Sequence, residues 1–121
     1  MKSDYELIAG FLRDDQFGPC VMFGLGGILS ELEKDVAFAL APLGRADATA
    51  LIRSIRGRKL IKGFRGMAPL NEEVMADILV SLGSLGTSCE QIEQIDINPL
   101  AISGGVPTAV DATIIVGGHK Q

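Results

Sequence analysis

Near its C-terminal end the chain places two carboxylates and an amide at spacings that fit a metal site. Asp96 and Asn98 lie two residues apart in a segment of alternating apolar and polar residues, and Asp111 follows the pair Gly104-Gly105. If the two glycines are the central residues of a hairpin turn, the register places Asn98 opposite Asp111. Opposed side chains share a face of the sheet, as do residues two apart on one strand. The hairpin therefore predicts three hard oxygen ligands together, the type that Mg²⁺ takes alongside water and phosphate.

A second interpretation of these residues stays open. The solvent side of a half-buried sheet carries the same polar residue types without binding a metal. The register also depends on the turn, because a loop that includes Ser103 or Val106 would shift the strand by one residue and separate the faces.

A glycine-rich segment, Gly24-x-Gly26-Gly27, is the second candidate for chemistry. Consecutive backbone N–H groups in such a loop can bind an anion, and Glu31 follows closely enough to point into the same space. The segment is not a dinucleotide fingerprint, because Leu29 stands where the third glycine would be, and it lacks the GK[ST] of a P-loop. A plain hairpin turn is the alternative.

A basic stretch from Arg53 to Arg65 is the third candidate. It could bind phosphates, but a solvated face that balances the acidic remainder of the chain is the favoured interpretation. Cys20 and Cys89 are far apart and His119 is the one histidine, so a zinc site or a Cys–His catalytic pair is not expected.

These residues need a framework of strands and helices to position them. Apolar segments predict strands at residues 6–12, 20–23, 35–40, around 95–98 and at 108–116. Helical spacing predicts one helix from a cap at Asp47 to near Gly57, and a second from a cap at Asn71 to Gly86. Pro99 makes its strand an edge or a bulged strand. The order of elements indicates an α+β fold with two helices and a mainly antiparallel sheet.

Length and composition set the class of protein. The 121 residues, 47% hydrophobic and 21% charged, predict a single domain over residues 1–121 with its own core. There is no apolar run of membrane-spanning length, and the polar first residues are not a signal peptide. The net charge of −4 argues against nucleic acid as a partner. We therefore expect a cytoplasmic protein that binds neither membrane nor nucleic acid.

Three segments together resemble the NDP-forming (ADP-forming) acyl-CoA synthetases. They are FGPCVMFGLGGILSELEKDVAFALAPL at 17–43, LIKGFRGMAPL at 60–70, and IDINPLAI with VPTAVDATI at 95–114. The resemblance is to the C-terminal lobe of the ATP-grasp domain in that family, covers about Tyr5 to Val116, and extends more distantly to succinyl-CoA synthetase β subunits.

The resemblance implies roles for particular residues. It makes Asn98 and Asp111 the ligands of the magnesium on the nucleotide phosphates, and it associates Asp96 with a phosphohistidine relay. It places three residues near the nucleotide cleft: Gly26, Gly27 and Glu31. The chain departs from the family pattern at GGILSE, where GGIFVE is usual, and at Asn71, where an Asp is usual.

The resemblance also implies a reaction, cofactors and partners. The reaction is that of an acid–thiol ligase, acyl-CoA + ADP + phosphate ⇌ acid + CoA + ATP, with Mg²⁺ and ATP/ADP as cofactors. The N-terminal ATP-grasp lobe and the CoA-binding domains would lie outside this chain, which we expect to be an excised portion with little activity alone. Two alternatives are a regulatory synthetase-like region of a lysine acetyltransferase and a separate subunit that completes its site with a partner chain.

Overall fold

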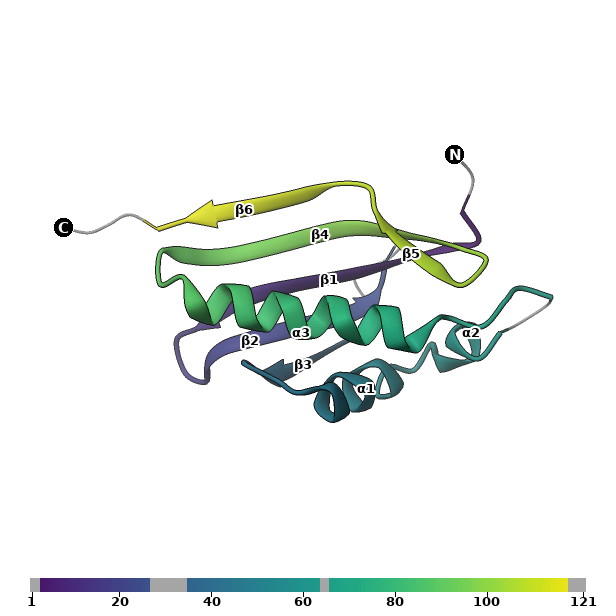
Figure 1. Ribbon diagram of the computed structural model, residues 1–121, viewed down its shortest axis with the longest axis horizontal. Helices are drawn as coiled ribbons and strands as arrows, with labels where there is room; N and C mark the ends of the chain where they lie inside the picture. The colour runs from purple at the N-terminus through teal and green to yellow at the C-terminus, as the bar shows by residue number, and fades with distance from the viewer. Residues whose placement is uncertain (1–2, 27–34, 64–65, 118–121) are drawn as a thin grey trace.

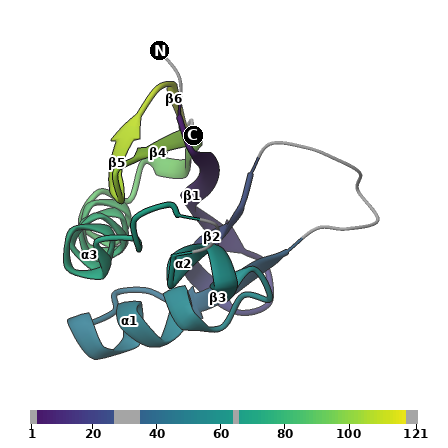
Figure 2. The same cartoon turned by 90° about the vertical axis from the view of Figure 1, so that its right-hand side faces the viewer.

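The computed structural model describes residues 3–26, 35–63 and 66–117, which form an antiparallel six-stranded sheet. The strand order is β3-β2-β1-β4-β5, and β6 also pairs with β4. Two longer helices, α1 and α3, lie on the same side of the sheet (Figures 1 and 2). The elements are β1 (Tyr5–Asp14), β2 (Gly18–Leu25), β3 (Val36–Leu40), α1 (Arg45–Arg53), α2 (Arg58–Ile61), α3 (Glu72–Ser88), β4 (Ile92–Ser103), β5 (Val106–Ala109) and β6 (Ala112–Val116).

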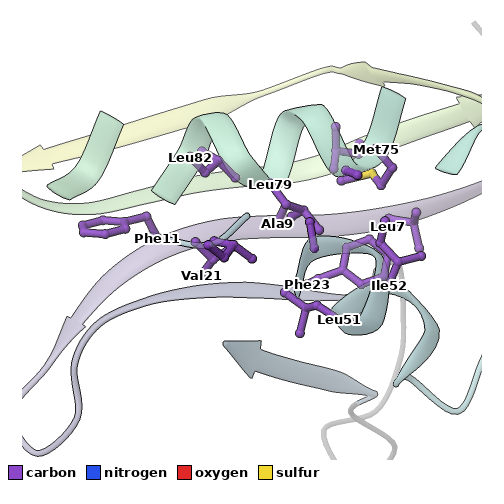
Figure 3. Packing of buried hydrophobic residues seen from close by; sticks show 14 of the residues in the cluster. Leu7, Ala9, Phe11, Val21, Phe23, Leu51, Ile52, Met75, Leu79 and Leu82 are labelled. Carbon is purple, nitrogen blue, oxygen red and sulfur yellow. The ribbon is translucent and has the colours of Figure 1, made fainter. Parts of the chain in front are cut away.

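The core lies between the sheet and the two longer helices. Strand β1 shows the alternation that this arrangement requires, because Leu7, Ala9 and Phe11 are fully buried and point to the helices. They meet Met75, Leu79 and Leu82 of α3 (Figure 3), and strand β2 and helix α1 complete the same cluster. The predicted α+β class with a mainly antiparallel sheet is confirmed.

Helix α3 begins where the sequence predicts and ends later. The side chain of Asn71 accepts a hydrogen bond from the Val74 N–H at 3.1 Å, so the predicted N-cap is confirmed. The predicted stop at Gly86 is wrong, because the helix continues to Ser88. A Cβ at Gly86 would collide with the ring of Phe11, so this glycine permits close packing of helix on sheet and does not end the helix.

Helix α1 differs from its prediction at both ends. Its N-cap is Gly44, and Asp47 is the third helical residue, whose carboxylate accepts the Gly44 N–H at 3.3 Å. The helix ends at Arg53 and not near Gly57. The predicted cap is therefore three residues late, because an Asp that caps a helix and an Asp that reaches back from the first turn have the same sequence signal.

The C-terminal strands also correct two expectations. The single return strand predicted at 108–116 is split into β5 and β6 on either side of Val110-Asp111. Strand β4 is not at the edge, because β1 pairs with it on one side and β5 and β6 on the other. The β1–β4 register shifts between Leu7 and Ala9, which places a bulge at Asn98-Pro99, so Pro99 marks a bulged strand.

The side of the sheet that faces away from α1 and α3 is called the open face below. Phe38 and Leu40 lie on it and are 54% and 62% exposed, whereas Ala37 and Ala39 pack against the core. Among the described residues no helix is long and apolar enough to cross a membrane. Strand alternation assigns further residues to the open face, namely Ile8, Gly10 and Leu12 of β1, Met22 and Gly24 of β2, and Asp96 of β4.

Candidate functional site

A two-residue turn joins β4 to β5, as the glycine pair predicts. Ser103 and Val106 oppose each other directly, and Gly104 and Gly105 have φ values of 58° and 83°, in the left-handed region that glycine adopts freely. The turn packs against the start of α3. The Gly105 carbonyl accepts the Asn71 N–H at 2.8 Å, and a Cβ at Gly105 would collide with the Pro69 carbonyl.

The predicted register of this hairpin is confirmed across the gap between β5 and β6. Leu100 pairs with Ala109 before the gap, and Ile97 pairs with Ala112 after it. Within the gap the Asn98 N–H donates to the Asp111 carbonyl at 3.1 Å. Asn98 therefore lies opposite Asp111, and the break between the two strands falls beside the proposed ligands.

The third predicted residue, Asp96, precedes Asn98 by two residues in β4 and lies on the open face. It is half-buried between Thr113 of β6 and Gly10 of β1, whereas Asn98 and Asp111 are exposed. The three residues that the sequence predicts together are thus neighbours along β4 and across the backbone hydrogen bond from Asn98 to Asp111.

Gly10 is a feature of the site that the sequence reasoning missed. It lacks a side chain beside Asp96, and a Cβ there would lie 2.5 Å from the Ile95 carbonyl oxygen. The sheet surface next to the acid is therefore bare backbone. The available signal was a glycine inside an apolar strand, which often marks the close approach of a ligand or of another backbone.

The donor set fits magnesium on phosphate. Two carboxylates and one amide are hard oxygen donors, and Mg²⁺ usually takes one or two protein carboxylates and completes its shell with water and phosphate. In the part of the chain that the structure describes, no three His, Cys, Asp or Glu side chains form a closed metal cage.

The glycine-rich segment is described as far as Gly26. Its N–H donates to the Glu6 carbonyl at 2.9 Å, so this amide extends the sheet and is not free for an anion. A Cβ at Gly26 would lie 3.0 Å from a methyl carbon of Ile8, which explains the need for a small residue. Gly27 and Glu31 lie outside the described residues.

The basic stretch is partly neutralised by the chain itself. Arg53 pairs with Glu72 at 2.8 Å, and Arg56 lies 3.9 Å from the carboxylate of Asp35. These pairs favour the solvated, charge-balancing interpretation of the stretch over a phosphate site. Arg65 lies outside the described residues.

The two cysteines are free thiols, as expected. Burial raises the pKa of the Cys20 thiol, with a smaller contribution from Asp14, so Cys20 is not an activated nucleophile. Cys89 is half-buried near the end of α3. His119 lies outside the described residues.

Comparison with known proteins identifies the family to which the chain is similar. The model of an ATP-grasp domain family matches residues 1–116. The β subunit of ADP-forming acetate–CoA ligase I from Pyrococcus furiosus is 47% identical over 111 residues, which cover 92% of this chain and 48% of that subunit. ADP-forming acetate–CoA ligase I from Archaeoglobus fulgidus is 35% identical over 93% of this chain and 16% of its own length.

Solved structures of related proteins have the same fold as this chain. A dinucleotide-forming acetyl-coenzyme A synthetase 1 from Candidatus Korarchaeum cryptofilum, determined with coenzyme A and Mg-AMPPCP, superposes with a TM-score of 0.89 at 44% identity. The match covers 97% of this chain and 55% of that one. The chain therefore belongs to the ATP-grasp family of the ADP-forming acyl-CoA synthetases. It spans about half the length of the β-subunit relatives it matches.

Proposed function

We propose that this chain is the C-terminal lobe of the ATP-grasp domain and forms one wall of a Mg²⁺–nucleotide site in an ADP-forming acyl-CoA synthetase. The observation that carries the proposal is the register that sets Asn98 opposite Asp111, at the break between β5 and β6. Family membership supports the assignment, because the same two residues are the magnesium ligands that the resemblance implies.

The residues of this wall act by electrostatics and position. Asn98 and Asp111 would hold the metal, which when bound neutralises phosphate oxygens and fixes their geometry. A backbone hydrogen bond joins the Asn98 N–H to the Asp111 carbonyl and holds the two strands together here, so little reorganisation is needed on binding. Gly10 lies beside Asp96, and its lack of a side chain lets the Ile95 carbonyl oxygen approach β1 closely.

Asp96 is the residue that we assign to the phosphoryl relay. Asp96 is half-buried and precedes Asn98 by two residues in β4, just before the bulge at Asn98-Pro99. A related Korarchaeum enzyme was solved with a phosphohistidine segment that points towards the nucleotide site. We assign such a segment to a part of the enzyme outside residues 1–121.

The rest of the active site would be supplied by other parts of the enzyme. The match covers about half of a separate β subunit in one relative and about one sixth of a longer polypeptide in another. Both a split and a fused arrangement of the enzyme are therefore compatible with this chain. We therefore assign the second ATP-grasp lobe and CoA binding to segments beyond this chain. Because ATP, ADP and CoA are substrates, we place the enzyme in the cytoplasm. The intact metal donors favour a synthetase over an inactive regulatory region.

The test is ATP formation from acyl-CoA, ADP and phosphate by the complete enzyme. Asn98→Ala and Asp111→Ala should each lower kcat by about 100-fold, because each removes a ligand or a positioned donor from the metal. Raised Mg²⁺ should partly restore the activity. Thr113→Ala, a polar neighbour of Asp96 on β6, is the matched control and should retain the activity.

The proposal also predicts that the isolated chain binds Mg-ATP weakly in calorimetry. Wild-type turnover by both ligand variants, or tight magnesium-dependent binding of ATP by the chain alone, would contradict the assignment of this chain as one wall of a shared site.

A further inference from the structure

An apolar groove runs along the outer side of α3, on the opposite face of the sheet from Asp96. It has a volume of about 340 Å³ between the helix and β4. Apolar side chains make up most of its lining, namely Val74, Ile78, Leu82, Leu85 and Ile97. Val74 and Leu85 are 36% and 48% exposed, so the two ends of the groove are open to solvent.

Strand β6 extends this groove sideways. Ile97 pairs with Ala112 and Ile95 pairs with Ile114, and directly opposed residues share a face. Ile114 therefore lies on the helix side of the sheet, yet it is 52% exposed, and all five residues of β6 are exposed. Figure 1 shows α3 alongside β1 and β4, with β6 beyond it. Among the described residues the helices thus cover the sheet as far as β4 and leave β6 uncovered.

Acidic residues predominate around the groove, although Arg45 of α1 and Arg13 of β1 also reach α3. The segment from residue 66 to 117 contains seven Asp and Glu residues and neither Lys nor Arg. Glu73 and Asp77 lie on the exposed side of α3, and the carboxylate of Glu93 lies against Gly117 at the end of β6. Arg45 of α1 pairs with Asp77, which itself lines the groove, so the charge of this acid is already partly neutralised.

We propose that the groove between α3 and β6 docks an amphipathic helix of a partner chain, with an apolar stripe and flanking Lys or Arg residues. A helix is about 10 Å wide with its side chains, so one more helix beside α3 would complete the layer over β6 and cover Ile97 and Ile114. The acidic rim selects cationic flanks and disfavours acidic ones. An added strand at the edge of β6 would leave the wall formed by α3 uncovered.

The probe is a synthetic helical peptide of about 18 residues, or roughly five turns, with leucines at i, i+3, i+4 and i+7 and lysines on the flanks. A second peptide carries glutamates in place of the lysines. Calorimetry with the full chain should show binding of the lysine peptide that weakens between about 0.05 M and 0.5 M salt, and no binding of the glutamate peptide.

Matched variants locate the binding. The double variant Leu85→Ser with Ile114→Ser should weaken binding by about tenfold or more, because both side chains are solvent-exposed apolar contacts of the groove. Phe38→Ser removes an equally exposed apolar side chain from the open face and should leave binding unchanged. Circular dichroism confirms that each variant is folded. Asn98→Ala should also bind the peptide normally, which separates this result from the fate of the metal site.

Any of three results with the peptides would overturn the proposal. They are failure of the lysine peptide to bind, equal binding of the two peptides, and binding that survives the double variant. If light scattering shows instead that the chain forms a dimer that Ile114→Pro abolishes, the groove belongs to a second copy and not to a basic helix.

Discussion

At the residue scale, the site depends on which side chains the hairpin brings together. Asn98 and Asp111 could be paired from the sequence because a Gly-Gly turn of two residues sets the register of everything that precedes and follows it. The break at Val110-Asp111 could not be predicted, because Thr108 to Val116 carries a continuous strand-like pattern. The engagement of the Gly26 N–H by Glu6 was equally hidden, since it depends on a strand far away in the chain.

Tyr5 gives a prediction for stability against pH. Its hydroxyl is buried without a hydrogen-bond partner among the described residues, and burial, with a smaller effect of Asp4, raises the pKa of this phenol to about 12. The unfolded chain has the ordinary phenol pKa of about 10. A raised pKa of an acid means that its stabilising contribution is complete below about pH 10 and is lost as the pH rises towards 12.

Tyr5→Phe removes that titration and the unpaired hydroxyl together. We expect the variant to be as stable as the parent at pH 7, or more stable, and its advantage to grow at pH 11. Urea unfolding at the two pH values measures the difference, and the comparison with the parent cancels the titration of lysines. An advantage that is the same at pH 7 and pH 11 would show that Tyr5 ionises as freely in the fold as in the unfolded chain, and would contradict the raised pKa.

At the element scale, the β4–β5 turn is the device that sets the ligand register. Gly104 has φ 58°, and a Cβ added there would meet no atom within 4 Å, whereas a Cβ at Gly105 would collide with Pro69. Asn tolerates the left-handed region, so Gly104→Asn creates an Asn-Gly turn and should change the free energy of unfolding by less than about 0.5 kcal/mol. Gly105→Asn should cost about 1–3 kcal/mol.

Denaturant unfolding measures both turn variants, and NMR shifts of β5 and β6 report the register. Only Gly105→Asn should disturb those shifts. Equal tolerance of both substitutions would mean that the contact with Pro69 does not hold the turn in place.

Helix α3 supplies a second prediction at this scale. Gly→Ala inside a helix ordinarily stabilises it by about 1 kcal/mol. At Gly86 the added methyl would collide with the Phe11 ring, so we expect Gly86→Ala to destabilise the fold by about 1–3 kcal/mol. Ser84→Ala on the exposed side of the same helix is the control and should change stability little. Thermal unfolding of the two variants decides, and a higher Tm for Gly86→Ala would contradict the packing role.

The errors of sequence reasoning at this scale share a cause. The sequence predicts a stop at Gly86 and a cap at Asp47, but each residue type has two structural uses that local sequence does not separate. The cap at Asn71 is predicted correctly because the acidic first turn and the long apolar stripe after it agree with a cap at that position. The α+β class followed from the order of strands and helices, which tolerates such local errors.

At the scale of the whole molecule, the sheet has two faces with different tasks. Leu7, Ala9 and Phe11 direct one face to α1 and α3, and the intervening residues leave the other face open beside Asp96 and the metal pair. The composition indicates enough apolar residues to build a core. It could not show that Phe38 and Leu40 would lie on the open face, because every residue of Val36–Leu40 is apolar and neither face is marked as the exposed one.

The most direct test is a crystal structure of the complete enzyme with ADP and Mn²⁺ in place of Mg²⁺, using the anomalous signal of manganese. We expect a peak at about 2.1 Å from the side-chain oxygens of Asn98 and Asp111, with the nucleotide phosphates completing the shell. A manganese peak on the phosphates but away from both side chains would contradict the assignment of this hairpin as the metal site.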